Sequence, residues 1–61
     1  MNLAQLKEKT KELITKNPEL KDDLMEFYYL AVSEIEEGGS ESHECELAYS
    51  DMMDLIESNH D

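Results

Sequence analysis

The chain has 61 residues, and its 16 aspartates and glutamates against 5 lysines give it a formal net charge of −11 at pH 7. A chain this short forms one domain at most, with no room for both a fold and a walled ligand pocket of ~300 Å³ or more, which argues against an independent enzyme. So acidic a chain repels phosphate groups and anionic lipids, which argues against direct nucleic-acid or membrane binding.

The first of three predicted helices covers about residues 3–16. Asn2 is placed to cap this helix, and Gln5, three residues later, completes the pattern of a capping box. Apolar residues then recur at helical spacing along one face, although the polar side chain of Thr10 interrupts the stripe. These features predict a surface helix of mixed charge.

The second predicted helix is the longest and covers about residues 18–37. It follows Asn17-Pro18, where the proline disfavours a helical residue before it and Asn17 is placed to cap the new helix. Gly38-Gly39 ends the helix, because glycine adopts positive φ readily. Two neighbouring apolar stripes predict a central helix that is contacted from two sides. The main stripe consists of Leu20, Leu24, Phe27, Tyr28, Ala31 and Ile35.

The third predicted helix covers about residues 41–57, with Ser40 or Ser42 as its cap. Its apolar residues follow a 3-4-3 spacing that is typical of a packing seam between helices. That seam consists of Cys45, Ala48, Met52 and Leu55. Because the connection at the two glycines is short, the second and third helices are predicted to form an antiparallel hairpin. The sequence therefore predicts one all-α, three-helix domain over residues 1–61.

The negative charge is concentrated in the second half of the chain. All five lysines lie in residues 1–23, where five acids balance them, whereas residues 24–61 hold eleven acids and no base. One interpretation is a solvated face that keeps a small protein soluble. The other is a DNA mimic, in which carboxylates take the place of phosphates against a DNA-binding protein. The candidate acidic face consists of Glu34, Glu37, Glu41, Glu44, Asp51 and Asp54.

The hairpin also carries more apolar side chains than three short helices can bury. The surplus includes tyrosines and methionines, which are enriched at protein interfaces and adapt well to partners. We therefore predict an interaction surface whose partner is a protein with a basic or mixed apolar and basic face, or a second copy of the chain in a homodimer. The candidate surface consists of Met25, Tyr29, Val32, Tyr49 and Met53.

Neither a metal site nor a nucleophile is predicted. In His43-Glu44-Cys45-Glu46, the histidine and the cysteine stand two residues apart, and such residues do not face each other on a helix. The pair Glu57 and His60 has the spacing of half a di-iron ligand set, but the other half is missing. The glutamates beside Cys45 favour a neutral thiol, which is a poor nucleophile. We therefore expect no cofactor, no metal and no catalytic residue.

The single cysteine cannot form an intramolecular disulfide, and no apolar run approaches the ~18 residues of a membrane span. The first residues, from Met1 to Lys7, also lack the continuous apolar stretch of a secretory signal. These features predict a cytoplasmic protein.

Taken as a whole, the chain resembles the small early accessory proteins of lambda-like bacteriophages, which are encoded between the recombination and excision genes. The pattern that carries the resemblance is the run NPELKDDLMEFYY, residues 17–29, together with the helix from His43 to Ile56. The resemblance implies a compact, helical, non-essential protein of the host cytoplasm that alters host physiology or the lytic–lysogenic choice through host proteins. It implies no catalytic residues.

The sequence thus favours a small acidic helical protein-interaction module without enzymatic activity, namely a phage early regulator that acts on a host or phage protein. The alternative is a DNA-mimicking inhibitor of a DNA-binding protein. A structural self-assembly element is the third hypothesis. Binding to an apolar surface would resist salt, whereas mimicry of DNA would be weakened by salt, so the two leading hypotheses predict different behaviour.

Overall fold

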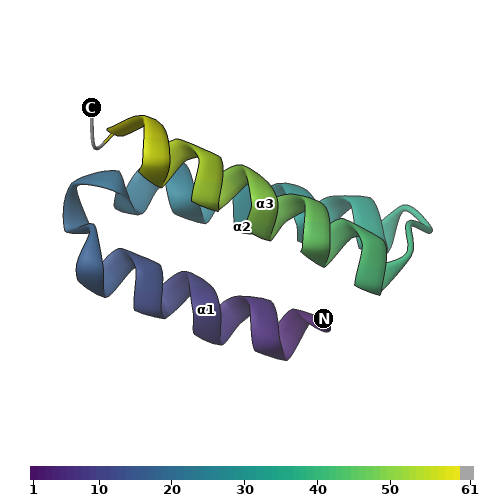
Figure 1. Ribbon diagram of the computed structural model, residues 1–61. Coiled ribbons are helices and arrows are strands. Elements are labelled where there is room, and N and C mark those ends of the chain that lie inside the picture. Colours follow the sequence, from purple (N-terminus) through teal and green to yellow (C-terminus); the bar gives the residue numbers. More distant parts are fainter. Residues whose placement is uncertain (60–61) are drawn as a thin grey trace.

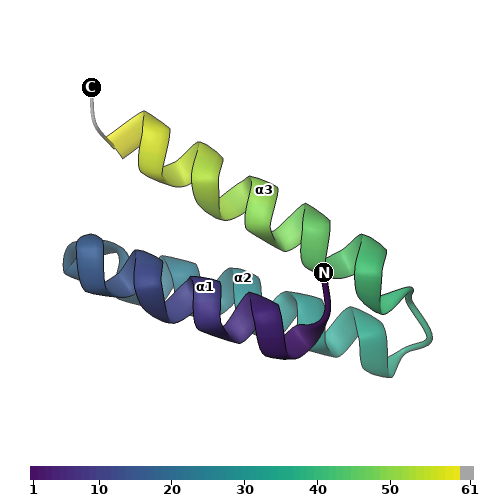
Figure 2. The same cartoon turned by 60° about the horizontal axis from the view of Figure 1, so that its bottom comes forward.

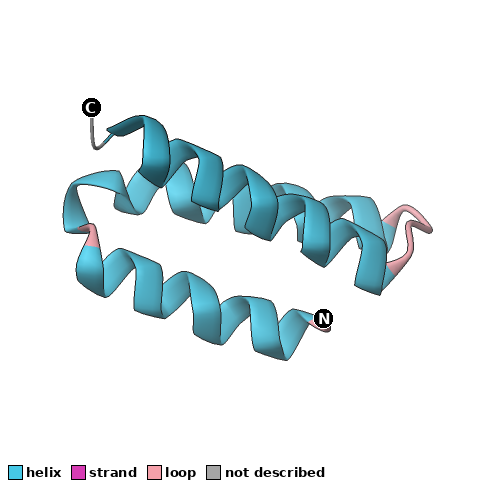
Figure 3. Cartoon of the chain, in the orientation of Figure 1, coloured by secondary structure: helices cyan, strands magenta, loops and turns pink. Residues whose placement is uncertain are grey.

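A computed structural model describes residues 1–59 as three helices joined by two short connections (Figures 1 and 3). Helix α1 covers Leu3–Lys16, α2 covers Lys21–Glu36 and α3 covers Glu41–Asn59, with a short 3-10 turn, η1, at Pro18–Leu20. The part of the chain that the structure describes contains no strand. The predicted all-α, three-helix fold is confirmed, and α2 and α3 pack closely as an antiparallel hairpin.

The capping box at the start of α1 is confirmed. The Asn2 side-chain oxygen accepts a hydrogen bond from the Gln5 backbone amide at 2.8 Å, and the Gln5 side-chain oxygen accepts one from the Asn2 amide at 3.0 Å. Each bond satisfies an amide that the helix itself leaves unpaired. The beginning of α1 is therefore determined by two residues that are close in sequence.

The predicted start of the second helix is wrong in one respect. Residues 18–37 do not form a single α-helix, because η1 precedes α2, and Asn17 makes no side-chain capping bond to η1. As a result α2, with 16 residues, is shorter than α3, with 19, although the second helix was predicted to be the longest. Instead, its side-chain amide and its backbone amide both donate to the Leu13 carbonyl, at 3.0 and 2.8 Å. Asn17 is thus buried at the end of α1 and satisfies a carbonyl there.

The turn between α2 and α3 depends on its two glycines. Gly38 has a φ of +106° and donates to the Ile35 carbonyl at 3.1 Å, while Gly39 donates to the Glu34 carbonyl at 2.8 Å. This pair of bonds is a Schellman motif, which needs a left-handed residue after the helix. The Ser40 hydroxyl then accepts a bond from the His43 amide at 3.4 Å, at the start of α3.

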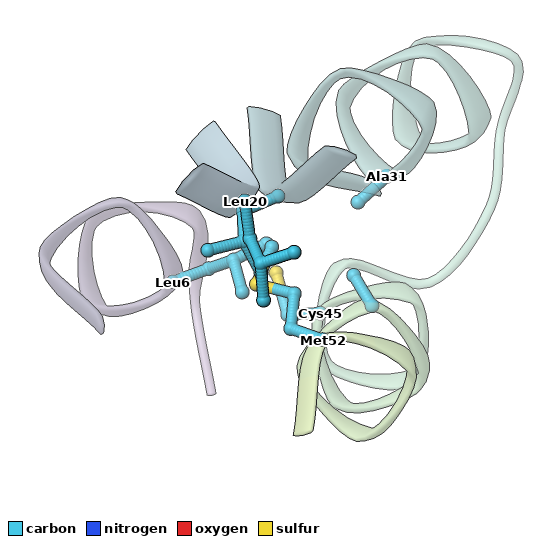
Figure 4. Packing of buried hydrophobic residues seen from close by; sticks show 7 residues of the cluster. Leu6, Leu20, Ala31, Cys45 and Met52 are labelled. Carbon is cyan, nitrogen blue, oxygen red and sulfur yellow. The ribbon is translucent and has the colours of Figure 1, made fainter. Parts of the chain in front are cut away.

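The core lies where the three helices meet, and its side chains point toward one another in Figure 4. The buried hydrophobic residues are Leu6, Leu20, Leu24, Ala31, Cys45, Ala48 and Met52. Thr10 is buried with them rather than interrupting the stripe of α1. Its hydroxyl donates to the Leu6 carbonyl at 2.7 Å and lies 3.6 Å from the Met52 sulfur, so the polar group is satisfied within its own helix.

The N-terminus lies at the same end of the bundle as the α2–α3 turn, as the two views in Figures 1 and 2 show. Two contacts join α3 to the beginning of the chain there. The Glu41 carboxylate accepts a hydrogen bond from the Leu3 amide at 2.8 Å, and the Met1 amino group lies 3.5 Å from a carboxylate oxygen of Glu46. The start of α1 is therefore held against the first turns of α3.

Candidate functional site

Among residues 1–59, four large apolar side chains remain substantially exposed. Tyr29 is 60% exposed and Met53 is 41% exposed, and both belong to the predicted interaction surface. Leu30 and Leu47, at 55% and 48%, do not belong to it. Because exposed leucines of this size are candidate anchors for a partner, the position of these two residues decides where the candidate site lies.

Leu30 and Leu47 line one hollow of about 130 Å³ between α2 and α3, which we name the α2–α3 groove. Its lining consists of Phe27, Leu30, Ala31, Glu34, Glu44, Leu47, Ala48 and Asp51. Five of these residues are apolar and three are acidic, and no lysine is among them. The groove therefore combines exposed apolar surface with negative charge.

Helical periodicity places these residues on facing rows. The four from α2 follow offsets of 0, 3, 4 and 7 from Phe27, and the four from α3 follow the same offsets from Glu44. Residues at this spacing share one face of a helix. The alanine in each row is buried at the interface between the helices, whereas the leucine beside it remains about half exposed. Small alanines allow close approach of the two helices and leave the larger leucines at the surface.

The predicted interaction surface is not brought together as one patch. Met25 and Tyr29 line a second hollow of about 270 Å³ between α1 and α2, together with Lys7, Thr10, Lys11 and Tyr28. Tyr49 instead faces α1 from α3, and the Lys9 amino group lies 5.4 Å from the centre of its ring, a cation–π arrangement. Val32 is half-buried on α2, and Met53 is exposed on α3.

The predicted acidic face is also divided. Glu34, Glu44 and Asp51 line the α2–α3 groove. Glu41 accepts the bond from the Leu3 amide, and Glu37 is the C-terminal capping residue of α2. Asp54 is exposed on α3. Three of the six acids therefore lie on one surface together with two exposed leucines, a combination that neither set of candidates contained.

Cys45 has no exposed surface and packs in the core. Burial raises the pKa of its thiol above the ordinary value, and the carboxylate of Glu41 raises it further, as do those of Glu46 and Glu44, while the N-terminal amino group acts in the opposite direction. The thiol therefore stays neutral at pH 7 and contributes as a small apolar side chain.

Among residues 1–59, no three histidine, cysteine, aspartate or glutamate side chains are placed to hold a metal ion together. His60, which the sequence pairs with Glu57, lies outside the described residues. Over the same range, no helix combines the length and the apolar character needed to cross a membrane.

A repeated sequence pattern indicates the α2–α3 groove, although the predicted interaction surface did not include its two leucines. The pattern of an apolar residue, an alanine and an acid at offsets 3, 4 and 7 occurs once in each hairpin helix, but it forms a groove only if the two faces that carry it pack against each other.

Comparison of the chain with protein-family models, with curated proteins and with solved structures gives no match.

Proposed function

We propose that this protein is a protein-interaction module without enzymatic activity, which binds a partner protein through the α2–α3 groove. The observation that carries the proposal is the exposure of Leu30 and Leu47 on the two sides of one groove. Exposed apolar side chains gathered at one place on a small domain mark an interaction site, and their burial supplies most of the binding energy.

The resemblance to early accessory proteins of lambda-like phages supports a narrower version of the proposal. In that version the module is an early regulator in the host cytoplasm, and its partner is a host or phage protein with a basic or mixed apolar and basic face. The net charge of −11 supports such a partner, because opposite charge accelerates association.

The competing function is inhibition of a DNA-binding protein by mimicry of DNA. It is favoured by the three acids, Glu34, Glu44 and Asp51, that line the groove. The leucines between them argue for the interaction module, because a surface that imitates phosphates needs no apolar centre. In a DNA mimic the carboxylates dominate binding and competing DNA removes the partner.

Capture of a partner from bacterial lysate on the immobilised protein tests the proposal. The double variant Leu30→Gln and Leu47→Gln removes the apolar anchors but keeps good helix formers. The matched control is Met53→Gln, which removes an exposed apolar side chain elsewhere on α3. We expect the control to retain a partner that the double variant loses. Loss of capture in the control but not in the double variant would place the interaction outside the groove.

A further inference from the structure

We infer that the occupant of the α2–α3 groove is a basic amphipathic helix of the partner protein, an inference that rests on the function proposed above. The occupant inserts one large apolar side chain between Leu30 and Leu47. Its lysines or arginines, placed on both sides of that anchor, lie near Glu34 and Glu44 at one end of the groove and near Asp51 at the other.

The shape of the groove favours a helix over an extended peptide. Two antiparallel helices each contribute a row of residues that extends over two turns, or ~10 Å. A row of side chains from a helix of the partner fits between two such rows, as ridges fit grooves in helix packing. Within residues 1–59 there is no strand edge to which an extended peptide could add.

The size of the hollow favours a single anchor. Its volume of about 130 Å³ is below the range of small-molecule pockets, which begin near ~300 Å³. A hollow of this size suits one large apolar side chain. The exposed leucines on its two sides would cover such an anchor and exclude water from it.

The charges at the groove are placed at its two ends. Glu34 and Glu44 both line the groove, and both adjoin the turn: a Cβ atom on Gly39 would be 2.8 Å from the backbone carbonyl oxygen of Glu34 and 3.2 Å from the Glu44 Cγ atom. Asp51 follows Glu44 by two helical turns, toward the other end. A helix with bases about one turn before and one turn after its anchor matches this distribution.

The same charge disfavours a second copy of the chain as the occupant. Two copies, each with a net charge of −11, repel each other. All five lysines lie in residues 1–23, and none of them lines the groove. A basic helix instead meets a lining with three acids and no base. Charge complementarity therefore favours another protein.

The probe is a synthetic amphipathic peptide of ~14 residues, in which leucines and lysines alternate with helical periodicity and one tryptophan replaces the central leucine. The chain itself has no tryptophan, so the fluorescence of the peptide reports binding directly. Two control peptides accompany it, one with glutamate in place of lysine and one with the same composition in scrambled order. We expect only the basic amphipathic peptide to bind.

Two charge-matched triple variants locate the binding site. The groove triple is Glu34→Gln, Glu44→Gln and Asp51→Asn, and the control triple is Glu36→Gln, Asp54→Asn and Glu57→Gln, with the same net charge. We expect the groove triple to weaken peptide binding about tenfold or more at low salt, and the control triple about threefold or less. Leu30→Gln with Leu47→Gln should weaken it by about tenfold as well. Circular dichroism verifies that each variant is folded.

Equal losses in the two triples would overturn the inference, because they would show attraction to the overall charge. Equal binding of the scrambled or the glutamate peptide would also overturn it. If a lysate partner still requires Leu30 and Leu47 but the basic peptide does not bind, the proposed function stands and the helical occupant is wrong. A dimer that Leu30→Gln abolishes would make a second copy the occupant.

Discussion

The carboxylate of Glu41 accepts a hydrogen bond from the backbone amide of Leu3 at 2.8 Å, across 38 positions of the sequence. Leu3 is the first residue of α1, and the first turn of α1 contains no acidic residue of its own. A negative charge beside a helix N-terminus is stabilising, and here it comes from the first turn of another helix. The Glu41 carboxylate thereby places a negative charge at the N-termini of both α1 and α3.

We expect Glu41→Ala to lower the free energy of unfolding by about 1 kcal/mol, because it removes both the charge and the acceptor. Glu41→Gln should lower it less, since its amide oxygen can still accept the Leu3 bond. Urea unfolding followed by circular dichroism measures the free energy of unfolding of both variants. Asp54→Asn is the control, because it removes a negative charge elsewhere on α3. Equal stability of Glu41→Ala and the wild type would mean that the bond contributes nothing.

Gly39→Ala should destabilise the hairpin by about 1–3 kcal/mol. An added Cβ atom would lie 2.8 Å from the Glu34 carbonyl oxygen, which is a backbone atom and cannot rotate away as a side chain can. Thermal unfolding of this variant is compared with that of Ser42→Ala, an exposed position in the first turn of α3. A melting temperature equal to that of the control would contradict the close approach.

Tyr49→Ala and Tyr29→Ala should differ in their effect on folding. Tyr49 is half-buried and lies under the Lys9 amino group, so its truncation should cost about 1–3 kcal/mol of stability. Tyr29 is mostly exposed, and its truncation should change stability by no more than about 0.5 kcal/mol. Chemical unfolding of both variants tests this order, and the reverse order would refute the packing of Tyr49 against α1.

Stability should fall at alkaline pH in part because of Cys45. The pKa of its thiol is raised in the folded chain from the ordinary value of 9.0, mainly by burial. The unfolded chain therefore releases this proton first as pH rises through about 9, which stabilises the unfolded state and lowers the free energy of unfolding. We expect Cys45→Ala to show a shallower decline between about pH 8 and pH 10 than the wild type. Identical slopes would rule out this contribution.

Salt should raise the melting temperature, because the eleven acids of residues 24–61 repel one another in the folded state and no base lies among them.

Binding of a basic helix should weaken over the same salt range, whereas self-association of two acidic chains should strengthen. Sedimentation and peptide titration at about 0.05 and 0.5 M NaCl separate these effects. A melting temperature that stays constant or falls with salt would show that repulsion does not limit stability.

The parts of the fold that depend on neighbouring residues could be predicted from the sequence. The capping box of Asn2 and Gln5, the glycine turn and the seam of α3 each need only a few positions to be recognised. Asn17 was predicted wrongly because its side chain has two alternatives: it could satisfy the helix before it or the one after it. The burial of Thr10 was not predicted, because the sequence shows a polar residue in the stripe but not the bond of its hydroxyl to its own helix.

The candidate site could be predicted less well, because it depends on which faces of the helices meet. The excess of apolar residues on the second helix is visible in the sequence, but the side on which it stays exposed is not. The packing of Ala31 and Ala48 between α2 and α3 leaves Leu30 and Leu47 at the surface, and the contact of Lys9 with Tyr49 requires α1 to lie against α3.

The short connection at Gly38-Gly39 has a consequence for the order of folding. Short connections join α2 to both of its neighbours, but α2 packs more extensively on α3 than on α1, and contacts of α1 with α3, such as that of Leu3 with Glu41, join distant parts of the chain. Contacts between near segments form faster and with less loss of chain entropy. We therefore expect the hairpin to form first and α1 to detach first, with the amide protons of α1 exchanging faster than those of α2. The groove would then exist on the hairpin before α1 has docked.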